Sequence, residues 1–340
     1  MKCRSSRDGN RIASHAASFS LVNTPVDDES GGDVRVGVRI PRDVLVGDVG
    51  RVRSLLERVA ANKIDHVCVG DHVSFNGGQG FDGIVQAAVL AAAHPELPVQ
   101  IAVYLLPLRH PVLVARQLST LAALAPGRIT FGVGVGGEDR HEVEITGVDP
   151  KTRGTRMDEC LRTLRQLLAG ESVTLHGRFF DFEDARVLPP PEPPITILVG
   201  GRSEAAFLRA ATLGDGWLGI WMSPDRFTAA VSQIDHLARD AHRSWQPQHT
   251  LHTWCGLAAD RPAARRVLAA SMESLYQMPF ERFERYSPFG EPAEVARELS
   301  AYLPTTRRIN VIVEAPDVAY GIDAVGEVRR LLVDYATTIL

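Results

Sequence analysis

The feature that most constrains the fold is a regular alternation of short apolar runs with amphipathic segments. The apolar runs are rich in Val and Ile and recur from residue 34 to residue 315. Near-continuous apolar strands separated by helices are typical of a parallel sheet that helices cover. The predicted strands span 34–40, 66–70, 99–106, 128–136, 195–201, 216–220, 250–259 and 308–315.

The segments between these runs have helical periodicity. In residues 48–62, Val52, Leu55 and Val59 recur at helical spacing, and Asp48 precedes them as a helix cap. The predicted helices span 48–62, 81–94, 111–125, 155–169, 203–213, 224–242, 263–275, 291–302 and 323–338.

Eight such units favour a closed barrel over an open sheet. A doubly wound sheet would carry GxGxxG after its first strand, and residues 40–43 read Ile-Pro-Arg-Asp instead. Residues 172–188 have the pattern of a hairpin, which the proline-rich segment 189–194 closes. We therefore predict an α/β fold, a (β/α)8 TIM barrel with a hairpin insertion after helix 4 and an insertion before strand 8.

The chain is predicted to hold one folded domain behind a polar tail. Residues 1–33 end in an acidic and glycine-rich stretch, so we expect a disordered tail there and a single domain over 34–340. The four cysteines are scattered without metal or CxxC spacing, which favours a reduced, cytoplasmic setting. No apolar run reaches the length of a membrane span, and the first residues lack the apolar core of a secretory signal.

Charge excludes two classes of partner. The chain has 37 basic and 41 acidic residues, a net charge of −4, which argues against nucleic-acid binding and against polybasic attachment to a membrane. Of the basic residues, 34 are arginines. Codon usage in a GC-rich genome, such as an actinobacterial one, would explain that excess, and the alternative is a set of sites for carboxylates or phosphates.

In a barrel of this type the active site lies at the carboxyl ends of the strands. After the fifth predicted strand comes Gly200-Gly201-Arg202-Ser203. The glycines allow close approach of a ligand, Ser203 can cap the next helix, and Arg202 offers a fork for phosphate oxygens. We expect an anion site there; the alternative is an ordinary strand-to-helix turn.

Glycines also lie in the second half of the fourth predicted strand and directly after it, at 132, 134, 136 and 137. They make room for a flat ligand, or they only relieve crowding between strands. The run is no P-loop, because no GK[ST] follows it.

Asp71-His72 follows the second predicted strand, where a histidine can exchange a proton near neutral pH. The alternative is a histidine held by local hydrogen bonds. The sequence lacks HExxH and GxSxG, so we expect neither a metal site nor serine hydrolase chemistry.

Taken together, these motifs resemble those of the bacterial luciferase-like superfamily of flavin- or F420-dependent oxidoreductases. The resemblance covers about residues 34–340. It is carried by Asp71-His72, by the RHP that ends segment 105–111, and by the segments 127–137, 153–159, 177–191 and 197–218.

The resemblance implies a flavin or deazaflavin ring across the barrel mouth. It implies a bulge with a non-prolyl cis peptide bond in Ala102-Val103-Tyr104, the cofactor phosphate near residues 200–203, and His72 beside the ring. Two departures stand out: Asn76 and Gly137 occupy positions where F420-dependent sugar-phosphate dehydrogenases carry Trp and Glu. They argue against a sugar-phosphate or simple alcohol substrate. Glu138 follows one residue later as a candidate acid or base.

We therefore expect an F420-dependent oxidoreductase that transfers a hydride between the deazaflavin and a small organic substrate. The alternatives are an FMN-dependent two-component monooxygenase, which would need a reductase partner, and a non-catalytic flavin-binding paralogue. A homodimer is compatible with the fold. Segment 276–290, with Phe280, Phe283 and Tyr286, and Trp221 are expected around the substrate. The predicted site comprises the catalytic His72 and Glu138 and the cofactor-binding Asp71, Ala102, Val103, Tyr104, Gly134, Gly136, Gly137, Gly200, Gly201, Arg202 and Ser203.

Overall fold

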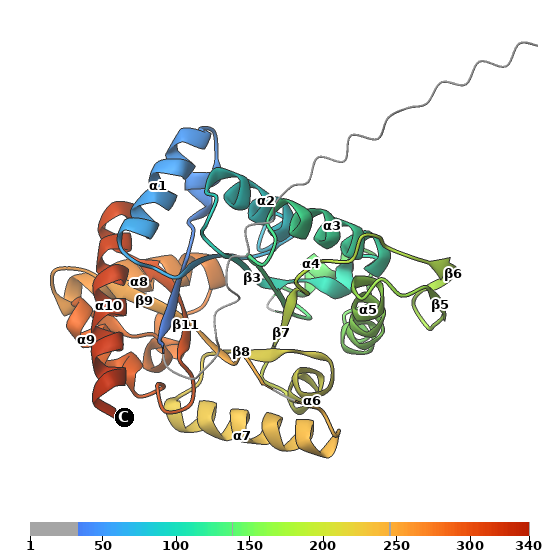
Figure 1. Ribbon diagram of the computed structural model, residues 1–340. Helices are drawn as coiled ribbons and strands as arrows, with labels where there is room; N and C mark the ends of the chain where they lie inside the picture. Colours follow the sequence, from blue (N-terminus) through green and yellow to red (C-terminus); the bar gives the residue numbers. More distant parts are fainter. Residues whose placement is uncertain (1–32, 138, 245, 340) are drawn as a thin grey trace, which may run out of the picture. The chain divides into compact units, whose positions relative to one another are not determined.

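Eight parallel strands close into a barrel in the computed structural model, which describes residues 33–137, 139–244 and 246–339. The strands follow the chain around the barrel, and pairing of β8 with β9 and of β11 with β1 closes it (Figure 1). The barrel strands are β1 Arg35–Arg39, β2 His66–Val69, β3 Val99–Tyr104, β4 Ile129–Val133, β7 Thr196–Gly200, β8 Gly216–Ile220, β9 Thr250–Leu257 and β11 Arg308–Glu314. The predicted (β/α)8 barrel is confirmed, whereas all but the last residue of the predicted tail lies outside the described residues.

Helices surround the strands (Figure 1). They are α1 Val49–Ala61, α2 Gly83–Ala93, α3 Pro111–Leu124, α4 Arg140–Glu144, α5 Arg153–Leu168, α6 Glu204–Leu213, α7 Pro224–Asp240, α8 Arg261–Tyr276, α9 Pro292–Ser300 and α10 Val318–Ile339. Short 3-10 turns lie at η1 Arg42–Leu45, η2 Leu106–Leu108, η3 Phe280–Arg282 and η4 Glu284–Tyr286. None of the helices in the described part is both long and apolar enough to cross a membrane.

Local sequence explains where these helices begin. The carboxylate of Asp82 accepts hydrogen bonds from the amides of Ile84 and Val85, and Ser203 accepts one from Ala206, so each satisfies free first-turn donors. The last helix begins at residue 318, five residues earlier than predicted, because Asp317 accepts a hydrogen bond from the amide of Tyr320 and starts the first turn. The short helix α4 was not predicted.

Both predicted insertions are present. The hairpin pairs β5 Val173–His176 with β6 Asp181–Ala185 in antiparallel register. Before β11, the chain forms the two 3-10 turns, the two-residue strand β10 Phe289–Gly290, which extends the sheet beside β9, and α9. Phe280 and Phe283 are buried there in a small apolar cluster with Trp254.

Two packing layers position the mouth of the barrel. Val36 and Val38 of β1 are fully buried in the main apolar core, and each such side chain contributes about 1.5–3 kcal/mol. Toward the amino ends of the strands, a buried polar chain runs from His66 Nε2 to Asn310 Oδ1 at 2.7 Å and from Asn310 Nδ2 to Gln100 Oε1 at 2.9 Å. Burial lowers the pKa of His66, so this chain is uncharged at neutral pH.

Candidate active site

A cavity of about 220 Å³ opens at the carboxyl ends of β2, β3, β4, β7 and β8, and we name it the cradle. It brings together most of the predicted site. The predicted residues that line it are Asp71, His72, Ala102, Val103, Gly134, Gly136, Gly200, Gly201 and Arg202. Tyr104, Gly137 and Ser203 do not line it. Glu138 lies outside the described residues.

The bulge that the resemblance implied is present in β3. The Ala102–Val103 peptide bond is cis, and the register with β4 shifts between Ile101 and Tyr104. Tyr104 itself is 1% exposed and packs against Phe131 in the core, so its side chain faces away from the cradle.

Glycines on the neighbouring strands make room for this bulge. A Cβ atom on Gly134 would lie 2.5 Å from Val103 Cγ2, one on Gly200 would lie 3.0 Å from Val103 Cγ1, and one on Gly132 would lie 2.4 Å from the carbonyl oxygen of Ile101. These three glycines therefore relieve crowding against β3. Gly136, at a φ of +70°, is required by its backbone conformation instead.

His72 is held by a carboxylate that the sequence did not indicate. Its Nδ1 lies 3.1 and 3.2 Å from the two carboxylate oxygens of Glu142, which is buried and also accepts hydrogen bonds from the amides of Val73 and Ser74. Burial would raise the pKa of Glu142, but the hydrogen bond from His72 and those amides outweigh it and hold that pKa below its usual value. The Nε2 atom of His72 has no partner in the described part of the chain, so it is available at the cradle.

Asp71 acts on the scaffold of the site. Its buried carboxylate accepts hydrogen bonds from the amides of Gly83 and Leu105, each at 2.9 Å, and pairs with both terminal nitrogens of Arg109 at 2.8 and 2.9 Å. Burial raises the pKa of Asp71, and the charge of Arg109 opposes that rise. Asp71 therefore joins the loops after β2 and β3 to α2, and its carboxylate is already occupied by protein groups.

The loop after β7 has the features expected of an anion site. Ser203 caps α6, and Trp217 Nε1 donates to the carbonyl of Gly201 at 2.8 Å, which holds the loop in place. Arg202 is exposed, and its guanidinium carbon lies 5.3 Å from the centre of the Trp221 ring. The first-turn amides of α6 and a guanidinium without an acidic partner among the described residues thus lie at the same loop.

Three further arginines in the segments that follow β3 and β4 have partners within the protein. Arg109 is bound to Asp71 and Asp82, Arg140 pairs with Glu144, and Arg153 donates to the carbonyl of Pro150.

An aromatic wall closes the cradle, and two buried polar atoms there lack partners. Trp221 packs edge-to-face against Tyr276 and at a tilt against Phe283, with ring centroid distances of 5.3 and 5.1 Å. Among the described residues, Trp221 Nε1 and His252 Nδ1 are buried without a hydrogen bond. Burial, and then the charge of Arg39, lower the pKa of His252 to about 3, so its ring is neutral. A bound molecule with complementary polar atoms would satisfy both groups.

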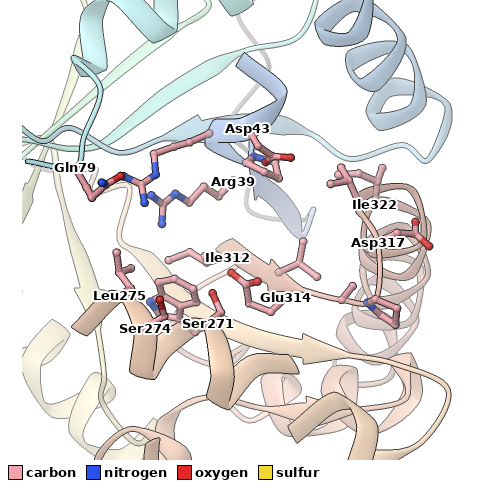
Figure 2. Close-up of a pocket in the computed structure, with 18 of the residues that line it drawn as sticks. Arg39, Asp43, Gln79, Ser271, Ser274, Leu275, Ile312, Glu314, Asp317 and Ile322 are labelled. Carbon is pink, nitrogen blue, oxygen red and sulfur yellow. The ribbon is translucent and has the colours of Figure 1, made fainter. Parts of the chain in front are cut away.

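A second cavity of about 670 Å³, shown in Figure 2, adjoins the cradle, and we name it the side chamber. The two cavities share Arg39, Arg42, Phe75, Leu275 and Ile312. The cradle alone is smaller than a usual ligand site of about 300–1,000 Å³, and the chamber supplies the missing space. Of the region expected around the substrate, Tyr276 lines the cradle, whereas Phe280, Phe283 and Tyr286 line neither cavity.

Sequence reasoning missed Glu142, His252, Arg39 and Arg42. Each comes from a segment without a recognisable motif, and the barrel brings it to the mouth from a distant part of the chain. Among the described residues, no cluster of His, Cys, Asp and Glu could hold a metal ion.

Comparisons with known proteins agree with this architecture. An uncharacterized protein of Mycobacterium tuberculosis is 35% identical over 175 residues, which are 52% of this chain and 60% of that protein. The F420-dependent glucose-6-phosphate dehydrogenase of Beutenbergia cavernae is 32% identical over 184 residues, 52% of each chain. The matches thus span 52–60% of the length of these curated relatives.

A solved F420-dependent secondary alcohol dehydrogenase, in complex with an F420-acetone adduct, has the same fold. It aligns with a TM-score of 0.76 at 18% identity and covers 88% of this chain and 99% of its own. The family model of luciferase-like monooxygenases matches residues 29–315, which is most of the chain. The chain therefore belongs to the luciferase-like monooxygenase family.

Proposed function

We propose that this protein is an F420-dependent oxidoreductase that transfers a hydride between the deazaflavin and a small organic substrate. The observation that carries the proposal is the pair formed by His72 and the buried Glu142 at the edge of a cradle with unsatisfied polar atoms. The relatives named as F420-dependent enzymes support the choice of cofactor.

The residues of the cradle suit a flat cofactor with a phosphate group. The loop Gly200–Ser203 would hold the phosphate, because it offers helix amides and the free guanidinium of Arg202. Trp221 Nε1 and His252 Nδ1 would hydrogen-bond polar atoms of the ring system. When bound, the deazaflavin supplies the hydride chemistry, and the protein supplies orientation and electrostatics.

His72 would handle the proton that accompanies the hydride. If Nδ1 carries the hydrogen that Glu142 accepts, neutral His72 has its lone pair on Nε2, the atom available at the cradle. Nε2 can then take a proton from a substrate group being oxidised or return it in the reverse direction. The ionised Glu142 would stabilise the charged imidazole that results.

The two departures from sugar-phosphate dehydrogenases have structural counterparts. Asn76 has a φ of +37°, and it donates from its backbone to Asp139 and from its side chain to the carbonyl of Leu275. Gly137 has a φ of +138°, which disfavours a side chain. We therefore propose that glucose 6-phosphate is not the substrate, and Glu138 remains a candidate acid or base.

An FMN-dependent monooxygenase is the second candidate, favoured by the description of the family model. Such an enzyme would take reduced FMN from a separate reductase. F420 has an anionic tail beyond its phosphate, whereas FMN ends at the phosphate, so the two cofactors make different demands on the surface next to Arg202.

Titration of the purified protein with F420 and with FMN, followed by fluorescence quenching, tests the proposal. We expect F420 to bind more tightly than FMN. A His72→Asn variant should keep F420 affinity and lose turnover by a factor of about 10²–10⁴, the usual contribution of a general acid or base. Tight FMN binding without F420 binding would refute the F420 assignment, and cofactor binding without turnover by any reductant would indicate a non-catalytic paralogue.

A further inference from the structure

Two arginines on one wall of the side chamber have no direct ion pair in the described part of the chain, although the carboxylates of Asp43, Glu314 and Asp317 also line the chamber. Arg39 ends β1 and Arg42 begins the 3-10 turn that follows, so both guanidinium groups come from one short segment. Both arginines line the chamber, and neither forms a hydrogen bond or an ion pair in the described part of the chain. Several other half-buried arginines, such as Arg109 and Arg329, have carboxylate partners.

The guanidinium group of Arg39 also acts on that of Arg42. Burial lowers the pKa of Arg42, and the charge of Arg39 lowers it further. Two like charges in a partly buried cavity are unfavourable unless a counter-charge joins them, which makes the pair receptive to an anion.

We propose that the side chamber is the substrate subsite and that Arg39 and Arg42 bind a carboxylate or phosphate group of the substrate. This proposal rests on the proposed function, because it names the substrate class for that site. A carboxylate and a phosphate both present paired oxygens to a guanidinium fork, and the experiment below separates them.

The opposite wall describes the rest of the substrate. Ile312 and Glu314 extend from β11 and Ser271 from α8, across the chamber from Arg39 (Figure 2). Ile312, Leu275 and Trp254 form an apolar surface for a short carbon skeleton, and the carboxyl of Glu314 can bond a hydroxyl or amine on it. Burial raises the pKa of Glu314, and the hydrogen bond from Ser271 and then the charge of Arg39 oppose that rise.

Arg39 also sets the distance of the substrate from the cradle. A Cβ atom on Gly70 would lie 3.4 Å from Arg39 Nη2, and Gly70 lines the cradle two residues before His72. A substrate anchored on Arg39 is therefore held next to the reacting end of the cradle. The substrate class is a small hydroxy or amino compound, other than a sugar phosphate, that carries a carboxylate or a phosphate.

Isothermal titration calorimetry of the whole protein with inorganic phosphate and with malate tests this assignment. We expect at least one of these anions to bind the wild-type protein. Arg39→Gln and Arg42→Gln should each weaken its binding about tenfold or more, because each removes a charged hydrogen-bond donor. The matched control is Arg53→Gln, an exposed arginine on α1, which should change the affinity less than about twofold.

Two further arms identify what the arginines bind. If Arg202→Gln abolishes anion binding and Arg39→Gln does not, the anion binds the loop after β7 and the proposal is wrong. If Arg39→Gln and Arg42→Gln lower F420 affinity by the factor that they lower anion affinity, the arginines serve the cofactor tail and the proposal is wrong. Failure of both anions to bind the wild-type protein also overturns it.

Folding and function are controlled separately. Thermal unfolding followed by circular dichroism shows whether each variant folds, and Arg39→Lys, which keeps the charge but not the fork, should bind the anion with intermediate affinity. If F420 fails to bind the wild-type protein while anion binding depends on Arg39 and Arg42, the proposed function fails and the anion site stands. If F420 binds and the Arg39→Gln and Arg42→Gln variants bind the anion as tightly as the wild-type protein, only the substrate assignment fails.

Discussion

The carboxylate of Asp71 offers the sharpest test of how the site is held together. In an Asp71→Asn variant, one acceptor oxygen becomes an NH2 group. Whichever oxygen is replaced, that group faces a backbone amide, of Gly83 or Leu105, and one terminal nitrogen of Arg109. The side chain of Asp71 is 0% exposed and that of Arg109 is 17% exposed, so water cannot replace the lost acceptor.

Breaking a buried ion pair by removing one partner costs about 3–5 kcal/mol, and we expect the free energy of unfolding to fall by that amount. Equilibrium unfolding in urea measures it, as a lower midpoint with an unchanged slope. Asp82→Asn is the matched control. Asp82 lies 3.3 Å from the same Arg109 but is 38% exposed, and asparagine caps a helix as well as aspartate does. The free energy of unfolding of Asp82→Asn should fall by less than about 1 kcal/mol.

A double-mutant cycle with Arg109→Met completes the test. The two substitutions should couple by about 2 kcal/mol, because the first already removes the partner of the second. The free energies of unfolding of Asp71→Asn and Asp82→Asn are then compared. If they differ by less than about 1 kcal/mol and Asp71→Asn changes only cofactor affinity, Asp71 contacts the cofactor and its role in the scaffold is refuted.

Three further predictions follow from the geometry. The pKa of Glu142 lies below its usual 4.5 in the folded protein, so its ionised form stabilises the fold above that pH and this stabilisation is lost as the pH falls. Glu142→Gln should therefore lower the free energy of unfolding by about 1–3 kcal/mol near neutral pH. The difference from the wild-type protein should vanish in acid, which urea unfolding at several pH values measures. Gly134→Ala should cost about 1–3 kcal/mol in the same assay, because its Cβ atom would clash with Val103, whereas Gly50→Ala in α1 should stay within about 1 kcal/mol. Buried thiols with raised pKa values should not react with a thiol-specific dye until the protein unfolds, so a Cys3→Ser variant should show no reactive thiol when native and three after denaturation: Cys68, Cys160 and Cys255.

Much of the barrel could be predicted because its signals are local. Each strand is a run such as Val34–Ile40, and each helix start depends on a cap within a few residues. The error at the start of α10 has the same local origin, since Asp317 was not identified as its first acceptor. The hydrophobic pattern of the sequence therefore predicts the order and type of the strands and helices. It predicts less well the residue at which each one begins.

The partners of the site residues could not be predicted in this way. Glu142 meets His72 across 70 residues, and no spacing rule relates a five-residue helix to the end of β2. The glycines after β4 were noticed in the sequence, but only the structure shows that Gly134 faces the side chain of Val103. Such contacts depend on which strands become neighbours.

The two cavities share a mouth but are lined mainly by different strands and helices. The cradle draws mainly on β2, β3, β4, β7 and β8, whereas the side chamber draws on β1, β9 and β11 with the helices α8 and α10. Substitutions in the second set can alter which molecule is accepted and leave the first set intact. A new specificity can therefore evolve, or be engineered, in one half of the barrel mouth without rebuilding the other half.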